Sequence, residues 1–146
     1  MTSRVHNGDS LEGDLDVFHA RLAAKGWYVH PKAPRGKTIG KKPPDYLLGS
    51  PTGRFFQFEA KSVKGSAWGV NLLDAHQYAA LHAFTGTAGI YLRLDTGDVW
   101  LPWSVVQPVW RAWYGSPKGA NGKRRGVYLD ASHGRVVRGM DWTVIA

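Results

Sequence analysis

The chain has 146 residues, 43% of them hydrophobic, which favours a single globular domain over residues 1–146. It contains no cysteine, so disulfides and thiolate metal sites are excluded. The formal net charge is +8 at pH 7 and unevenly spread, because residues 17–44 carry seven Lys or Arg and no Asp or Glu. Such a distribution suits a polyanionic partner, although basic surfaces also serve solubility alone.

No segment is apolar enough to span a membrane, and charged residues interrupt the N-terminal stretch where a signal peptide would be continuous. The first predicted element is a helix from Leu11 to Lys25, with Ser10 as its N-cap and Gly26 as its stop. Its apolar stripe is Leu11, Leu15, Phe18 and Leu22. A second stripe, at the edge of the buried face, is Glu12, Asp16 and His19.

A short strand is predicted at Trp27–His30, followed by a basic loop over residues 31–44 that is rich in Pro, Gly, Lys and Arg. Two further strands, Tyr46–Gly49 and Arg54–Val63, are separated by the four residues Ser50–Gly53. That spacing predicts a hairpin.

The second half of the chain predicts helices and short strands in alternation. After a loop at Lys64–Trp68, a helix is expected from Asp74 to Thr85, with the amide Gln77 placed within its apolar stripe. The remaining expected elements are a hairpin of Ala88–Leu94 with Val99–Leu101, a helix at Trp103–Trp113, a mobile basic loop at 115–126, and edge strands at Val127–Asp130, Val136–Arg138 and Trp142–Val144. This order predicts an α/β (α+β) fold with a sheet flanked by helices.

The predicted hairpin brings together the residues with the clearest chemistry. Asp45 opens the first strand, and the second strand ends Glu59-Ala60-Lys61. Because side chains alternate along a strand, Glu59 and Lys61 share one face. Two carboxylates and an ammonium at one end of a sheet are costly unless a cation or an anionic substrate completes the cluster. Magnesium would complete it.

The pattern Pro44-Asp45, then Glu59-Ala60-Lys61, resembles the PD-(D/E)xK nuclease motif. Neighbouring residues resemble the RecU family of Holliday-junction resolvases, over roughly residues 8–105. They are Gly8-Asp9-Ser10-Leu11-Glu12, Phe58-Glu59-Ala60-Lys61, Asn71-Leu72 with His76-Gln77, Ala88-Gly89-Ile90-Tyr91 and Trp100-Leu101-Pro102. The RecU family has a long stalk before the catalytic Asp, where this chain has only Pro31–Pro44. In this respect the chain is more similar to archaeal-type junction resolvases.

The resemblance implies a restriction-endonuclease-like core with a central mixed sheet, and an Mg²⁺-dependent endonuclease for which Mn²⁺ can substitute. Its implied substrate is the four-way DNA junction, cut by paired symmetric nicks within a homodimer. It places the protein in the cytoplasm of a bacterial, archaeal or phage-infected cell. Two alternatives stay open: a repair or restriction-type nuclease acting on other DNA, and a non-catalytic DNA-binding module of the same fold.

The resemblance also implies roles for individual residues. Asp45, Glu59 and Glu12 would bind the metal, with Asp16 as the alternative to Glu12; each could instead be an ordinary surface or helix-terminal acid. Lys61 would orient water or stabilise phosphate charge, unless it only protects an edge strand from pairing. Gln77 would hydrogen-bond that lysine or a water, unless it is a buried amide satisfied by the backbone.

Basic and aromatic side chains outside this cluster predict the DNA contacts. Phosphate contacts are expected from one set in the first basic loop and one in the second, unless both loops are merely solvated. The residues are Arg35, Lys37, Lys41 and Lys42, then Lys123, Arg124 and Arg125. Trp103, Trp110 and Trp113 recur along one helix, which is typical of core packing and also compatible with a dimer face.

Overall fold

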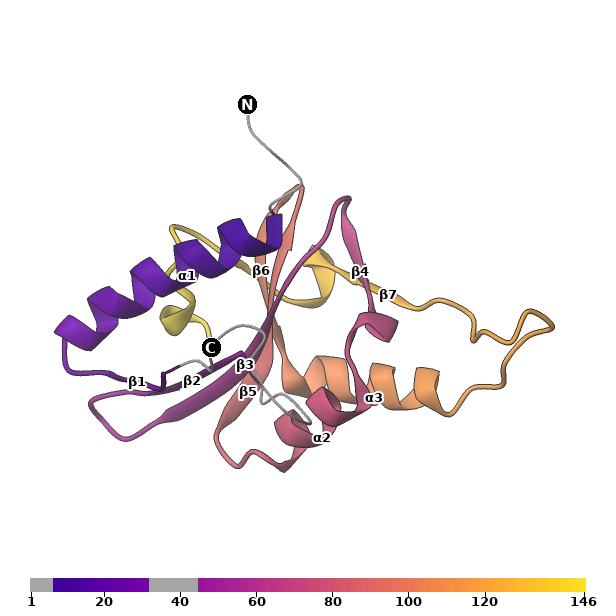
Figure 1. The fold of residues 1–146 in the computed structure, drawn as a ribbon, viewed down its shortest axis with the longest axis horizontal. Coiled ribbons are helices and arrows are strands. Elements are labelled where there is room, and N and C mark those ends of the chain that lie inside the picture. The colour runs from indigo at the N-terminus through magenta and orange to yellow at the C-terminus, as the bar shows by residue number, and fades with distance from the viewer. Residues whose placement is uncertain (1–6, 32–44) are drawn as a thin grey trace.

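The computed structural model describes residues 7–31 and 45–146, and its main element in these residues is a six-stranded sheet with the order β1-β2-β3-β5-β6-β8 (Figure 1). Its strands are β1 (Tyr28–Val29), β2 (Tyr46–Gly49), β3 (Phe55–Ser62), β5 (Thr87–Leu94), β6 (Gly97–Pro102) and β8 (Arg135–Val137). A separate pair is formed by β4 (Ala67–Gly69) and β7 (Tyr128–Asp130). The helices are α1 (Asn7–Ala24), α2 (Ala75–Ala83) and α3 (Trp103–Tyr114), with 3-10 turns η2 (Val70–Leu72), η3 (Ala131–His133) and η4 (Trp142–Val144).

The main sheet is mixed. β3 and β5 run parallel, whereas the other neighbouring strands are antiparallel. Parallel neighbours need a crossover connection, and the chain supplies it through β4, η2 and α2. The predicted α/β fold, a central mixed sheet flanked by helices, is therefore confirmed. None of the helices in the described ranges combines the length and the apolar character that crossing a bilayer would take.

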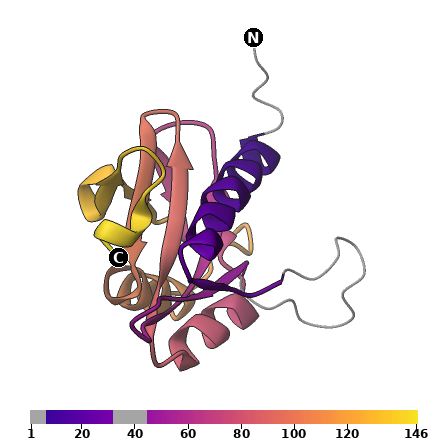
Figure 2. The same cartoon turned by 90° about the vertical axis from the view of Figure 1, so that its left-hand side faces the viewer.

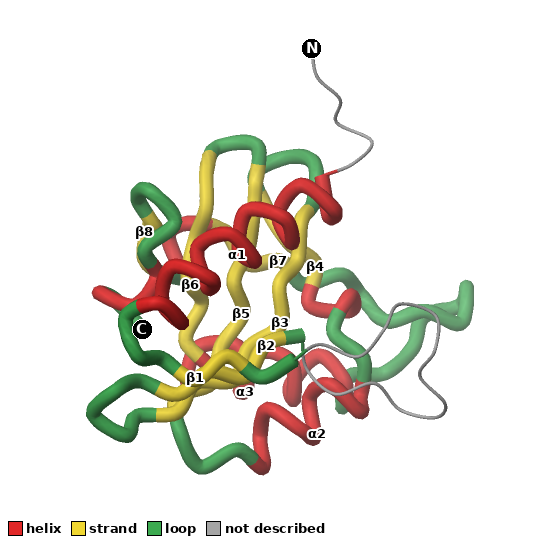
Figure 3. Tube along the Cα trace, turned by 60° about the vertical axis from the view of Figure 1, so that its left-hand side comes forward, coloured by secondary structure: helices red, strands yellow, loops and turns green. Residues whose placement is uncertain are grey.

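Helices cover both faces of this sheet, as Figures 2 and 3 show. α1 lies over one face and closes an aromatic core in which Trp142 stacks on Trp100, with ring centroids 5.7 Å apart. The indole of Trp142 also donates to His19 Nε2 at 2.9 Å, inside the same core. α2 and α3 lie over the other face, where Tyr78 stacks on Trp110 at 4.2 Å. Alternate residues of β5 thus enter two different cores, Tyr91 the first and Ile90 and Leu92 the second.

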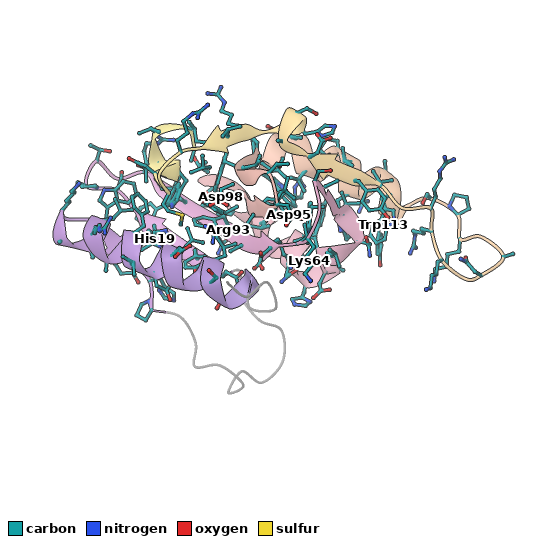
Figure 4. The ribbon with its side chains drawn as sticks, turned by 90° about the horizontal axis from the view of Figure 1, so that it is seen from above. His19, Lys64, Arg93, Asp95, Asp98 and Trp113 are labelled. Carbon is teal, nitrogen blue, oxygen red and sulfur yellow. The ribbon has the colours of Figure 1, made fainter. Side chains whose placement is uncertain are left out.

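Charged residues fasten α1 across the strands beneath it. Arg93 on β5 donates to Asp14 on α1 at 2.8 Å. It also forms two hydrogen bonds with Asp98 on β6, at 2.8 and 2.9 Å, and Figure 4 labels these two residues. Tyr91 donates to the same Asp98 at 2.7 Å. Because Arg93 is held by two carboxylates at once, its pKa is raised and it stays charged. This network fixes the position of the helix that carries Glu12 and Asp16.

Four local predictions require correction. The first helix begins at Asn7, so Ser10 lies within its first turns and is not its cap. The predicted loop 64–68 contains β4, which is only three residues long and forms because Trp68 pairs with Leu129 of β7. Residues 142–144 form the 3-10 turn η4 and no strand, because Asp141 caps them by accepting from Thr143 N at 3.2 Å. The helix predicted at 74–85 is the shorter α2, for which Asp74 is the N-cap.

Candidate active site

Asp45 and Glu59 meet across the β2–β3 hairpin. The register pairs Tyr46 with Phe58, so the residue before Tyr46 falls opposite the residue after Phe58. Two reciprocal hydrogen bonds fix them: Asp45 N donates to Glu59 Oε2 at 2.9 Å, and Ala60 N donates to Asp45 Oδ2 at 3.0 Å. Each carboxylate is therefore oriented by the backbone of the other strand.

The tight connection of the hairpin sets this register. Ser50 N donates to the carbonyl of Arg54 at 2.7 Å, and Gly53 N donates to that of Ser50 at 3.0 Å. Gly53 has φ +90°, a conformation that glycine adopts without strain. A connection one residue longer or shorter would move Glu59 to the other face of the sheet.

Alternation along β3 separates apolar from polar side chains. Phe56 and Phe58 point into the aromatic core beneath α1, and both are buried. Glu59 and Lys61 point to the opposite face, toward α2, where Lys61 Nζ lies 4.0 Å from Glu59 Oε1. Glu59 is 1% exposed, whereas Asp45 and Lys61 are only half-buried. The cluster thus has a buried floor and an open side.

Gln77 joins the cluster from α2. Its amide nitrogen donates to Glu59 Oε1 at 3.0 Å, and its amide oxygen accepts from Lys61 Nζ at 3.3 Å. The same oxygen accepts from the backbone N–H of Asp74 at 3.0 Å, at the start of the helix. An amide in an apolar stripe is explained by these three bonds, which link the helix start to the hairpin.

Burial and like charge act together on Glu59. Removal from water, followed by the negative charge of Asp45, raises the pKa of Glu59 from 4.5 to about 8, although Lys61 opposes the effect. Near neutral pH the carboxyl of Glu59 therefore holds a proton that a divalent cation can replace. Carboxylate oxygens are the ligands that a hard cation such as Mg²⁺ prefers, and a bound cation would offset the two negative charges. Asp45 and Glu59 are the residues that would hold it.

The two acidic residues of α1 approach the hairpin near Tyr46. The Tyr46 hydroxyl donates to Asp16 Oδ1 at 3.3 Å. Burial raises the pKa of Tyr46, and the charges of Asp16, Glu12 and Asp45 raise it further. Glu12 and Asp16 thus face the hairpin from the α1 side. In residues 7–31 and 45–146, no group of three or more His, Cys, Asp or Glu side chains is arranged to hold a metal ion. The role of Glu12, or of Asp16 in its place, stays a prediction.

The predicted DNA-binding residues are only partly described. Arg35, Lys37, Lys41 and Lys42 lie outside the described residues. Lys123 and Arg125 are exposed on the loop that follows α3. Arg124 has a local partner, because its Nε donates to the carbonyl of Ser116 at 3.2 Å.

Two contributors to the site were absent from the sequence prediction. Tyr46 links the hairpin to α1 through its hydrogen bond to Asp16. Its position in the sequence, directly after Asp45, could have indicated that it lies near the site. Asp74 supplies the N–H that holds Gln77, and the spacing Asp-x-x-Gln at a helix start is a known capping pattern.

No protein-family model and no curated protein matches the chain. Among solved structures, it is similar to Hjc, a Holliday junction resolvase from the archaeal hyperthermophile Archaeoglobus fulgidus. The two share 16% sequence identity, with a TM-score of 0.47, over 80% of this chain and 85% of that chain. Similarity at this level carries no information on chemistry or substrate, which have to come from the side chains of the site.

Proposed function

We propose that the protein is a divalent-metal-dependent endonuclease that hydrolyses phosphodiester bonds in DNA, with four-way junctions as its preferred substrate. The observation that carries the proposal is the buried carboxyl of Glu59, held against Asp45 with the ammonium of Lys61 4.0 Å away. A buried acid paired with a half-buried one, beside an amine, is poorly explained as a stabilising feature, because the pair favours uptake of positive charge.

Each residue of the cluster has a role that follows from its chemistry. Asp45 and Glu59 offer carboxylate oxygens to Mg²⁺ or Mn²⁺, which when bound would neutralise phosphate charge and lower the pKa of water. Lys61 is half-buried and can donate to a phosphate oxygen or to the attacking water. Gln77 holds Lys61 and Glu59 at once, so it positions both. In the reaction a P–O bond to water forms as a bridging P–O bond breaks, and the departing oxygen takes up a proton.

Charge supports DNA as the substrate. Residues 99–129 carry five Lys or Arg and no Asp or Glu, in addition to the basic run at 17–44. Cations on two separate segments suit a substrate with several phosphate backbones. Two symmetric cuts across a junction require two active sites, so we expect a C2 homodimer. Sedimentation should then give about twice the chain mass of 16.1 kDa.

A cleavage assay tests the proposal. A four-way junction and a linear duplex of the same sequence are each incubated with the protein, with Mg²⁺ or with a chelator. We expect paired nicks near the junction centre with Mg²⁺ only. Lys61→Ala should slow cutting by roughly 10² or more, the scale of losing one transition-state donor. Lys64→Ala is the matched control: it removes an exposed lysine three residues away and should cut normally.

The other outcomes each point to a different protein. Equal cutting of junction and duplex would replace the junction preference with a repair or restriction-type activity. Junction binding without cutting, in both Mg²⁺ and Mn²⁺, would indicate a DNA-binding module and refute the catalytic proposal.

A further inference from the structure

An arm extends from the end of α3 and returns to the body at β7 (Figure 1); it consists of residues 115–126. Its two sides pair through a bridge between Lys118 and Arg124, and Gly119 N donates to the carbonyl of Lys123 at 2.7 Å. The turn at its tip uses Gly122 with φ +77°. The predicted loop therefore folds back on itself as a narrow, defined projection.

A cavity of about 470 Å³ lies at the base of this arm, against α3. Its walls are almost wholly apolar, and its volume lies in the range of about 300–1,000 Å³ that is typical of small-ligand sites. It is lined mainly by Pro108, Val109, Ala112, Trp113, Arg125 and Val127. One cation, that of Arg125, thus stands beside an aromatic and aliphatic surface.

Arg124 stabilises this base from within the protein. Its guanidinium lies over the ring of Trp113, at 5.5 Å from the centroid, and over that of Tyr114, at 5.0 Å. These ring contacts, together with the hydrogen bond from Arg124 to the carbonyl of Ser116, hold Trp113 at the base of the arm. Figure 4 labels Trp113 at this place. Arg124 acts here as a positioning residue, which leaves Lys123 and Arg125 exposed to meet a partner.

The surroundings of the cavity indicate what occupies it. All five charged residues between positions 99 and 129 are basic, which suits a polyanionic partner. A polyanion that also fills an apolar aromatic cavity has flat apolar groups along a charged backbone, which describes unpaired nucleic acid. An acidic peptide does not carry a flat aromatic group beside each charge.

We propose that this cavity receives an unpaired nucleobase of bound DNA, which packs against Trp113 while Arg125 contacts the adjoining phosphate. The inference rests on the proposed function, because it takes DNA as the partner. The arm would then recognise a position where base pairing is interrupted, which phosphate contacts alone do not achieve.

Packing between α2 and α3 links the cavity to the candidate active site. Tyr78, which directly follows Gln77, stacks on Trp110 of α3 at 4.2 Å and accepts a hydrogen bond from Gln107 at 2.8 Å. α3 therefore lies against the helix that holds Gln77, on the same face of the sheet as Glu59. A DNA strand in contact with both places would be read at one and cut at the other.

Binding without cleavage provides the test. In chelator, the protein is titrated into a fully paired duplex and into the same duplex with one unpaired 2-aminopurine. We expect about 5-fold or more tighter binding of the second, with quenching of its fluorescence as the base stacks. Ala112→Phe fills the cavity from an exposed helical position and should abolish both effects, with paired-duplex affinity unchanged within about 2-fold. Ala20→Phe, at an exposed position of α1, is the matched control and should retain both.

Several results would overturn the inference: equal affinity for the two duplexes, an unquenched probe, or a preference that survives Ala112→Phe. A change in sedimentation on Ala112→Phe alone would assign the cavity to a protein contact and equally refute it. The cleavage assay is independent of this one. A protein that cuts junctions but ignores the unpaired base retains the proposed function, and one that recognises the base without cutting retains only the inference.

Discussion

Replacement of Glu59 by glutamine should abolish the loss of stability that the protein shows as the pH rises. The pKa of Glu59 is raised to about 8 in the folded protein, first by burial and then by the charge of Asp45. A group with a raised folded-state pKa stabilises the fold while it is protonated. Its contribution is fully present below the unfolded value, near 4.5, and is lost as the pH rises toward 8. Wild-type protein without divalent ions should therefore lose stability across this window, and Glu59→Gln should not.

The size of the effect follows from the same pKa values. The gap between 4.5 and about 8, at about 1.4 kcal/mol for each pKa unit, gives a loss of up to about 5 kcal/mol. Against this, glutamine cannot accept at both of the positions where Glu59 accepts from Asp45 N and from Gln77, which costs about 1 kcal/mol at every pH. The variant should thus be slightly less stable than wild type at pH 5 and more stable at pH 9.

Urea unfolding in EDTA, at intervals from pH 5 to pH 9, measures these curves. Asp45→Asn separates the two causes, because it removes the neighbouring charge and leaves burial, the larger cause, in place. Its curve should stop falling at a lower pH than that of wild type, so that the total loss of stability is smaller but not zero. If Glu59→Gln and wild type lose stability in parallel over the whole range, Glu59 does not carry the proton and the reasoning fails.

The remaining predictions concern the metal, the amide and the network under α1. At pH 8, Mg²⁺ at 100 times its Kd should stabilise wild type by about 2.7 kcal/mol, as measured by thermal unfolding, and should leave Glu59→Gln unchanged; equal stabilisation of both would place the ion elsewhere. Gln77→Ala should lower the turnover rate in the cleavage assay while KM stays within about 3-fold, because the amide positions Lys61 and Glu59 and does not hold DNA; a rise in KM alone would contradict this role. Arg93→Met should reduce the free energy of unfolding in urea by about 1–3 kcal/mol, because Asp98 and Asp14 lose their donor. The control is Arg21→Met, at an exposed position of α1, which should change that free energy by no more than about 0.5 kcal/mol. Equal losses of unfolding free energy in the two variants would show that the Arg93 network stabilises the fold no more than an exposed arginine does.

The predictable part of the molecule is the part that short-range rules determine. The hairpin of β2 and β3 follows from a short apolar run, an aromatic run and a four-residue connection between them, and β2 has the predicted bounds, Tyr46–Gly49. Register then places Asp45 opposite Glu59 without any tertiary information. The second hairpin was equally accessible, because Asp95-Thr-Gly-Asp turns the chain between β5 and β6 with Gly97 at φ +132°.

Elements that depend on distant partners were missed or misjudged. β4 has three residues and exists through its pairing with β7, some 60 positions later in the chain, so no local pattern announces it. The segment 142–144 alternates like a strand, yet its tryptophan is drawn into the core beneath α1 by Trp100 and His19. The distance of Glu12 from the hairpin carboxylates likewise depends on how α1 crosses the sheet, which the Arg93 network decides.

Gln77 shows how a local irregularity can report a distant arrangement. By periodicity its position belongs to the apolar stripe of α2, where leucine would be the expected residue. In the structure one amide satisfies a carboxyl, an ammonium and a helix-start N–H. Leucine would leave all three without that partner, at about 1–3 kcal/mol for the buried carboxyl of Glu59. An amide is tolerated there only because Glu59 and Lys61 face α2 from the neighbouring strand. The polar residue in the helix and the acid and amine in the hairpin therefore have one physical explanation, a charged cluster enclosed between the sheet and α2.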